Sequence, residues 1–134
     1  MNYWLVKSEP FKYSWDKFVS DGETFWDGVR NYQARNNMKA MAVGDQVLFY
    51  HSNEGMEVVG IAEVSAAAYQ DPTTDDERWV VVNLKPVKKL KKPVTLAQMK
   101  ETPELENMSL IRQSRLSVCD LSKEEFKLVV KMGS

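Results

Sequence analysis

Three strand-like runs lie close together in the middle of the chain, and their spacing constrains the fold more than any other feature. The runs are rich in the β-branched and aromatic residues that favour strands: QVLFYH at 46–51, VVGIAEV at 58–64 and WVVVNL at 79–84. The segments between them are polar and show no helical pattern that could carry a parallel crossover. The arrangement therefore favours an antiparallel barrel or curled sheet over a doubly wound α/β fold. Gly60, inside the second run, indicates a bulge or a close backbone approach.

The remaining segments complete a mixed domain. One strand is predicted at 3–7 and another at 116–119. Helices are predicted where capping residues or apolar spacing mark their starts: after Ser14, at 31–41, after the Thr95/Gln98 capping box and after the Ser122/Glu125 capping box. No internal repeat, low-complexity tract or linker interrupts the chain, so residues 1–134 are predicted to form one α+β domain.

The supply of cysteine and histidine argues against metal binding and nucleophilic catalysis. Cys119 is the only cysteine and His51 the only histidine, so no internal disulfide, zinc site or other metal site is expected. Ser52 adjoins His51, but neighbours on a strand point to opposite faces. Cys119 is expected to be a buried, inert thiol. No phosphate-binding or dinucleotide-binding glycine pattern occurs, and no cofactor is expected.

Hydropathy and charge indicate where in the cell the protein is expected and what kind of partner it could bind. The apolar runs are far shorter than a membrane span, and MNYWLVKSEP lacks the long apolar stretch of a signal peptide. We therefore expect a soluble intracellular protein, cytoplasmic or, in a eukaryote, nuclear. The formal net charge is -1 over 134 residues. Any contact with nucleic acid must consequently come from a local basic patch.

Three basic stretches could provide such a patch. They are the pair Arg30 and Arg35, the lysine-rich run KPVKKLKK at 85–92, and the pair Arg112 and Arg115. The lysine run alone is more simply interpreted as a solvated face. The guanidinium groups of Arg30 and Arg35 are better suited to phosphates and base edges than ammonium groups are.

Trp26 has two interpretations. Together with Asp27, Gly28 and Asn31 it places a ring, a carboxylate, an exposed backbone and an amide in one turn, which are the groups that hold an unpaired base. It is equally consistent with an ordinary core residue, and composition does not separate the two. The other tryptophans are expected in the core: Trp4, Trp15 and Trp79.

A series of motifs runs through the whole chain in a fixed order. These are WLVKSEP at 4–10, YSWD at 13–16, WDGVRNYQARNN at 26–37, VGDQVLFYHSN at 43–53, VGIAEV at 59–64, DPT at 71–73, KPVTL at 92–96 and RQSRLSV at 112–118. The series closely resembles the EVE domain family. That resemblance implies a PUA-like fold, a small mixed and curled β-barrel with flanking short helices, related to the ASCH and YTH domains.

The resemblance also implies a function and a site. It implies a non-catalytic domain that binds DNA or RNA. One nucleobase, expected to carry a modification, would occupy an aromatic and polar pocket. Carried over position by position, the ligand-binding residues are Lys7, Ser8, Trp26, Asp27, Asn31, Tyr50, His51, Ser52, Arg115 and Leu116. Trp26 is expected to stack, Ser8 and Asn31 to contact the base edge, and Arg30 and Arg35, with Arg115, to contact phosphates.

Two other functions remain open. Some PUA-like relatives hydrolyse an acyl group from a modified cytidine with Lys, Thr and Glu side chains. The comparable pair in this chain is Lys7 with Glu9. An ion pair at the end of a strand explains these two residues more simply. A protein-interaction module is the third hypothesis. The chain departs from the family pattern in a short loop at 74–78 and in EGME at 54–57, and both departures bear on ligand preference.

Overall fold

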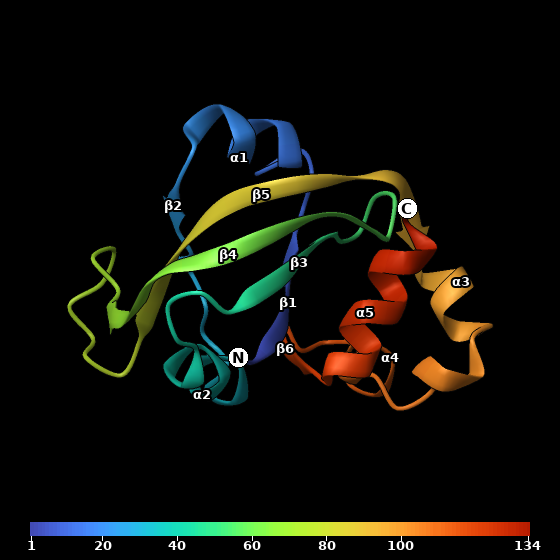
Figure 1. Ribbon diagram of the computed structural model, residues 1–134. Helices are drawn as coiled ribbons and strands as arrows, with labels where there is room; N and C mark the ends of the chain where they lie inside the picture. Colours follow the sequence, from blue (N-terminus) through green and yellow to red (C-terminus); the bar gives the residue numbers. More distant parts are fainter.

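The computed structural model describes residues 1–134, and its elements follow the expected order with some additions (Figure 1). They are β1 (Tyr3–Ser8), α1 (Trp15–Asp21), β2 (Thr24–Phe25), α2 (Tyr32–Ala40), β3 (Gln46–His51), β4 (Glu57–Gln70), β5 (Val80–Thr95), α3 (Leu96–Lys100), the 3-10 helix η1 (Pro103–Leu105), α4 (Ser109–Arg112), β6 (Val118–Leu121) and α5 (Lys123–Met132). No helix combines the length and apolar character needed to cross a membrane.

The strands form one six-stranded sheet in the order β2-β5-β4-β3-β1-β6. Every neighbouring pair is antiparallel except β1 and β3, which run parallel with Tyr3 opposite Gln46 and Ser8 opposite His51. The α+β class is therefore confirmed. The edge strands β2 and β6 do not pair with each other, so the curled sheet stays open rather than closing into a full barrel.

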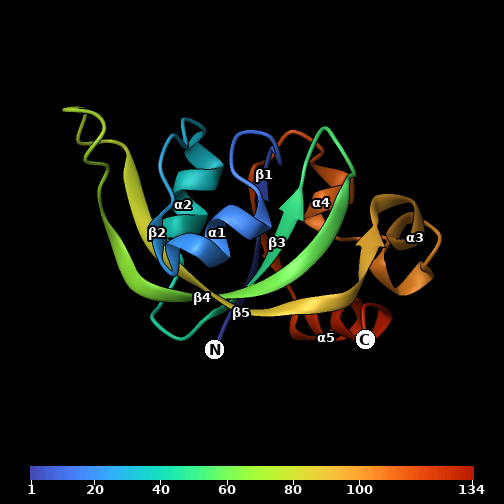
Figure 2. The same ribbon diagram turned by 90° about the horizontal axis from the view of Figure 1, so that it is seen from above.

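The hairpin of β4 and β5 is much longer than the sequence predicts. β4 continues to Gln70 and β5 to Thr95, so the lysine-rich run 85–92 lies within a strand. Their pairing register shifts at four places, one of them beside Gly60, and such bulges allow a long strand pair to bend. Figure 2 shows the result: β4 and β5 curve around α1 and α2, with α5 outside the curl.

Phe49 of β3 occupies the centre of the core. Its ring stacks on Phe18 with centroids 5.2 Å apart, and the rings of Trp15 and Trp26 meet it edge-on at 5.4 and 5.7 Å. The core positions of Trp4 and Trp15 are confirmed. Trp79 is buried too, but it packs against Tyr32 outside this cluster.

Local hydrogen bonds confirm most of the predicted helix ends. Ser14 Oγ accepts from Lys17 N at 3.1 Å, and both predicted capping boxes form. The last strand, β6, begins two residues later than the strand predicted at 116–119. The amide of Leu116 donates to the carbonyl of Gln113 in the turn that follows α4, so β6 begins only at Val118.

Candidate functional site

Trp26 is held between the core and a surface cavity. Its backbone N–H donates to the Val82 carbonyl at 2.8 Å, directly after the short pairing of β2 with β5. Its ring packs edge-on against Phe49 on one side and Tyr13, at 6.2 Å, on another. Although only 8% of the residue is exposed, it lines the cavity wall. Trp26 thus combines both interpretations, a core ring that also faces a cavity.

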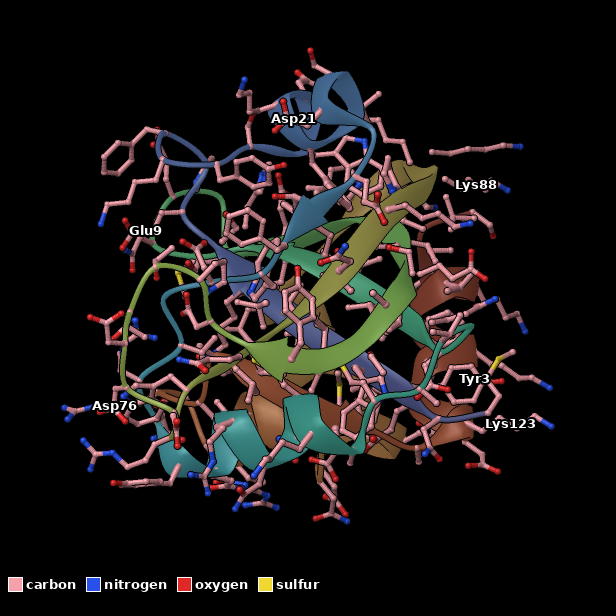
Figure 3. The ribbon with its side chains drawn as sticks, turned by 90° about the vertical axis from the view of Figure 1, so that its left-hand side faces the viewer. Tyr3, Glu9, Asp21, Asp76, Lys88 and Lys123 are labelled. Atoms are coloured by element: carbon pink, nitrogen blue, oxygen red, sulfur yellow. The ribbon has the colours of Figure 1, made fainter.

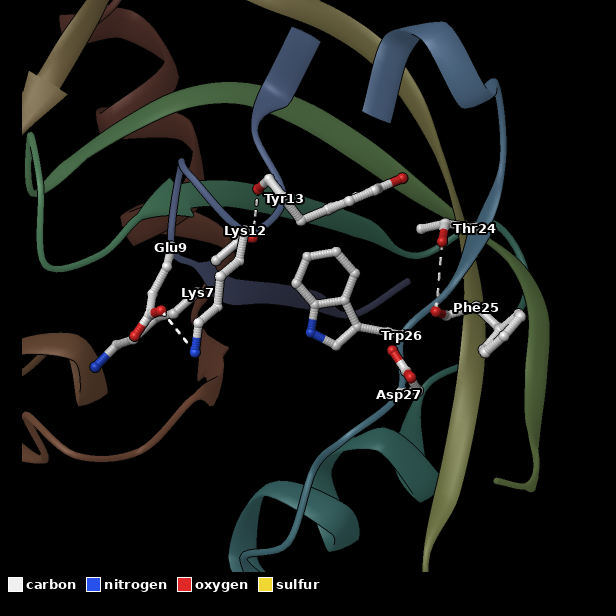
Figure 4. A pocket seen from close by; sticks show the side chains of 9 residues that line it. Lys7, Glu9, Lys12, Tyr13, Thr24, Phe25, Trp26 and Asp27 are labelled. Atoms are coloured by element: carbon white, nitrogen blue, oxygen red, sulfur yellow. Dashed lines mark hydrogen bonds and ion pairs between the residues drawn. The ribbon is translucent and has the colours of Figure 1, made fainter. Parts of the chain in front are cut away.

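The Trp26 cavity measures about 470 Å³ and is lined by residues 7–9, 12–13 and 24–27. This volume lies within the range of about 300–1,000 Å³ typical of small-molecule sites. Figure 4 shows Trp26 at its centre, with Tyr13 and Asp27 on opposite sides of the ring and Lys7 and Lys12 beyond it. The cavity therefore has aromatic walls and charged groups at its rim.

Two polar groups of the cavity have no partner within the protein. The indole Nε1–H of Trp26 donates to no protein acceptor, yet no buried side-chain nitrogen or oxygen is left unpaired, so this N–H is accessible from the cavity. The exposed carboxylate of Asp27 takes part in no ion pair and accepts no side-chain or backbone hydrogen bond. The cavity lining consequently includes a free donor and a free acceptor.

Other predicted residues of this cavity are engaged in the structure. Ser8 Oγ donates to the Tyr13 carbonyl at 2.5 Å, so the Ser8 hydroxyl is left with acceptor capacity only. Lys7 Nζ donates to the Ser114 carbonyl at 2.8 Å. Burial lowers the pKa of the half-buried Lys7 ammonium. Lys7 therefore joins the end of β1 to the segment before β6.

The expected Lys7–Glu9 ion pair does not form. Glu9 instead pairs with Lys12 at 3.0 Å and accepts a hydrogen bond from Asn53 Nδ2 at 2.5 Å. Lys7 has no carboxylate partner of its own. The two side chains considered for hydrolysis thus make separate contacts and do not act on each other.

Two further cavities adjoin the first one. The Tyr50 cavity, about 540 Å³, shares Lys7 and Glu9 with the Trp26 cavity and is also lined by Tyr50, Ser52 and Arg115. The Arg112 cavity shares Ser114 and Arg115 with the Tyr50 cavity and reaches Arg112, Asn31 and Leu116. The residues expected in one pocket, except His51, are therefore spread over three cavities in series, linked by Lys7 and Arg115.

His51 and Asn31 have structural roles in this arrangement. His51 Nε2 accepts from the Trp15 backbone N–H at 3.1 Å, at the start of α1, and its imidazole lines none of the three cavities. Burial lowers the pKa of His51, which favours the neutral ring that this hydrogen bond requires. Asn31 Oδ1 caps α2 by accepting from Ala34 N at 2.9 Å.

The structure holds Arg30 and Arg35 in a cluster with aromatic rings. The Arg30 guanidinium donates to Asp71 at 3.1 Å and lies 5.5 Å from the Trp79 ring centre. Arg35 contacts the Tyr32 ring at 5.0 Å and donates to Asn36. These groups already have partners, and neither residue lines the three cavities.

The side chains of Arg112 and Arg115 have no such partners. Neither guanidinium forms an ion pair or a hydrogen bond within the protein, and both line the Arg112 cavity. Arg112 belongs to one of the three basic stretches of the sequence but was not among the expected site residues. Its role depends on α4, a four-residue helix that the sequence did not predict.

Asp71 fixes the loop that carries Trp26 and Asp27. The buried carboxylate accepts from the Gly28 backbone N–H at 3.3 Å, from Arg30, and from both the backbone and the hydroxyl of Thr73. Burial opposes the charged form, but these hydrogen bonds outweigh it and lower the pKa of Asp71. Gly28 has a φ of 76°, a conformation that favours glycine. Asp71 of the DPT motif thus positions the start of the WDGVRNYQARNN motif.

Comparisons with known proteins show the family to which this chain belongs. The EVE domain model matches residues 2–132. Thymocyte nuclear protein 1 of Gallus gallus is 34% identical over 164 aligned residues, which cover 97% of this chain and 68% of the chicken protein. The alignment is longer than this chain, so the chicken protein carries insertions relative to it.

Two solved structures superpose over the whole chain. Protein Atu2648 from Agrobacterium tumefaciens is 50% identical with a TM-score of 0.98, covering 100% of this chain and 94% of its own. The human THYN1 protein, in complex with DNA containing 5-methylcytosine, is 32% identical and has a TM-score of 0.93. The match covers 100% of this chain and 98% of the human chain. These superpositions confirm the PUA-like fold that the motif series implied, and this chain is a member of the EVE domain family.

Proposed function

We propose that this chain binds DNA and accommodates a modified cytosine in the Trp26 cavity, as a reader without catalytic activity. The observation that carries the proposal is that one aromatic-walled cavity is lined by both the free indole N–H of Trp26 and the free carboxylate of Asp27. Both groups would lose solvent in a complex, so a ligand must supply an acceptor and a donor at matching positions.

Cytosine has the complementary groups on its edge. Its N4 amino group is a donor, for which a carboxylate is a suitable acceptor, and its ring nitrogen N3 and carbonyl O2 are acceptors for an N–H. The ring of Tyr13, which meets Trp26 edge-on, offers apolar surface to a methyl group at C5. In this arrangement Asp27 reads the amino group, Trp26 donates to the ring, and the aromatic walls accept the modification.

The adjoining cavities support a path for the DNA strand. Lys7 lies between the Trp26 and Tyr50 cavities, and Arg115 lies between the Tyr50 and Arg112 cavities. These cations, with Arg112, have no carboxylate partner and are suited to phosphates on either side of the bound nucleotide. The formal net charge of -1 makes such a local patch necessary.

The human relative supports DNA containing 5-methylcytosine as the class of ligand. It was solved with DNA containing 5-methylcytosine, and it aligns along the whole of this chain. We extend to this chain only the class of ligand, because the loop at 74–78 and the turn at 54–57 depart from the family pattern.

Fluorescence anisotropy tests the proposal with labelled DNA of one sequence carrying cytosine, 5-methylcytosine or 5-hydroxymethylcytosine. Burial of one methyl group contributes about 0.8 kcal/mol, so we expect about four-fold tighter binding of the methylated probe. Asp27→Asn should reduce the affinity for the methylated probe, while Glu124→Gln, which removes an exposed carboxylate in the first turn of α5, should not. Equal affinity for all three probes, or binding to none of them, would contradict the proposal.

A further inference from the structure

Phe11 is the most exposed aromatic side chain of the protein. Of the residue's surface 76% is accessible, compared with 52% for Tyr32 and 42% for Phe25. It sits in the turn between β1 and α1, directly after Pro10. A single exposed apolar residue needs no explanation by itself, so its surroundings decide whether it has a role.

The turn that carries Phe11 is firmly held. The backbone N–H groups of Lys12 and Tyr13 both donate to the Glu9 carbonyl, at 3.0 and 2.9 Å. Ser8 Oγ donates to the Tyr13 carbonyl, and the Glu9–Lys12 ion pair closes the turn on its outer side. Pro10 restricts the backbone further. The exposed ring is therefore presented by an ordered turn and does not belong to a loose loop.

The same turn forms one wall of the Trp26 cavity. Glu9, Lys12 and Tyr13 line that cavity on either side of Phe11 in the chain, but Phe11 itself does not. Figure 3 shows Glu9 at one end of β1 and Tyr3 at the other, so the turn projects from the end at which the cavity lies. The turn that presents the Phe11 ring to solvent therefore borders the cavity.

We propose that Phe11 is a wedge that enters the base stack of a DNA duplex at the position vacated by the base in the Trp26 cavity. The proposal rests on the function proposed above. A base that leaves the duplex exposes the faces of its neighbours, and an inserted apolar side chain restores part of the lost stacking.

The wedge predicts a dependence on the duplex that the cavity alone does not. A single strand has no stack to fill. In a duplex with an abasic position opposite the modified base, the neighbouring bases are still uncovered when that base leaves. Phe11 should therefore matter in both duplexes and not in the single strand. Stacking on an aromatic ring contributes about 1–3 kcal/mol per base, which corresponds to roughly five-fold to more than a hundred-fold in affinity.

The test compares Phe11→Ala with the wild-type protein on three probes of one sequence, each containing 5-methylcytosine. The probes are a duplex with the base paired to guanine, the same duplex with an abasic position opposite, and the single strand. We expect Phe11→Ala to weaken binding of both duplexes at least five-fold and binding of the single strand less than two-fold. Phe11→Leu should restore part of the loss because it keeps an apolar side chain.

Val43→Ala is a matched control. Val43 is 66% exposed and precedes β3, whereas Phe11 follows β1. Because β1 and β3 are parallel, the two residues lie at opposite ends of the same strand pair. An equal loss on all three probes in Phe11→Ala, or no loss on any, would overturn the wedge. Failure of the wild-type protein to bind any probe would instead contradict the proposed function.

Discussion

The indole ring of Trp15 lies directly against the backbone of Gly60. A Cβ atom at position 60 would stand 2.5–2.7 Å from three atoms of the six-membered ring, closer than such contacts allow. The glycine therefore lets α1 approach β4 at the point where the strand pairing shifts its register. The same ring packs on Phe49, which in turn supports Trp26.

Substituting Gly60 by alanine should destabilise the fold through this contact. Overfilling a packed core costs about 1–3 kcal/mol, and the rigid Trp15 ring has little freedom to move away. Urea unfolding followed by intrinsic fluorescence measures the loss. In a Trp15→Phe background the same substitution should cost less, because phenylalanine lacks the outer part of the indole. Equal costs in both backgrounds would contradict this account of Gly60.

His51 should make stability depend on pH near neutrality. Burial is the largest cause of its lowered pKa; Glu57 and Asp16 act to raise that pKa and Lys89 to lower it. The unfolded chain therefore takes up a proton before the folded protein does, and stability falls as the pH drops below 6.5 and through the lower folded value.

The test measures unfolding midpoints across this pH range for the wild-type protein and for His51→Gln. The glutamine amide oxygen can still accept a hydrogen bond from the Trp15 backbone N–H. The variant should show a flatter profile. Parallel profiles for the two proteins would show that His51 does not cause the dependence.

Loss of the Asp71 carboxylate should loosen the loop that carries Trp26. Asp71→Asn removes charge-assisted acceptors of Gly28, Arg30 and Thr73 and should cost about 1–3 kcal/mol of stability at neutral pH. Because the folded pKa is lowered, the contribution is present above pH 3.8 and is lost as the pH falls through the folded value. The difference between wild type and variant should shrink in acid, and a constant difference would contradict this assignment.

Arg112 and Arg115 should account for more of the salt dependence of DNA binding than Arg35 does. Each phosphate contact to a duplex contributes about 0.9 to the slope of log affinity against log salt concentration. Arg112→Ala and Arg115→Ala should each lower the slope by about that amount. Arg35→Ala should leave it unchanged, because Arg35 lies over Tyr32 and donates to Asn36. The reverse ranking would place the DNA path along α2 instead.

Helix ends and strand interiors were predictable from the sequence because local contacts determine them. The bonds of Ser14 to Lys17 and of Thr95 to Gln98 span three residues each, so the residues that make them stand close together in the sequence. The parallel pairing of β1 with β3 was not predictable in the same way. It brings Tyr3 opposite Gln46 after a long excursion through α1, β2 and α2, and no local pattern encodes that return.

Some of the residues that the sequence assigns to one site also lie together in the fold. Lys7, Ser8, Trp26 and Asp27 come together in one cavity. The sequence could not show which of these side chains are free to bind a ligand, because tertiary contacts decide it. The Ser8 hydroxyl, for example, donates to the Tyr13 carbonyl. The same holds for Arg30, whose partner Asp71 lies 41 residues away in the chain.

The most direct test of the central claim is the indole N–H signal of Trp26 in nitrogen-edited NMR spectra. Titration with a DNA strand containing 5-methylcytosine should shift this signal, because the free N–H would gain an acceptor in the cavity. The indole N–H of Trp4, which already donates to Asp45 at 3.0 Å, serves as the internal reference and should not move. A bound complex in which the Trp26 signal stays in place would show that the modified base does not enter this cavity.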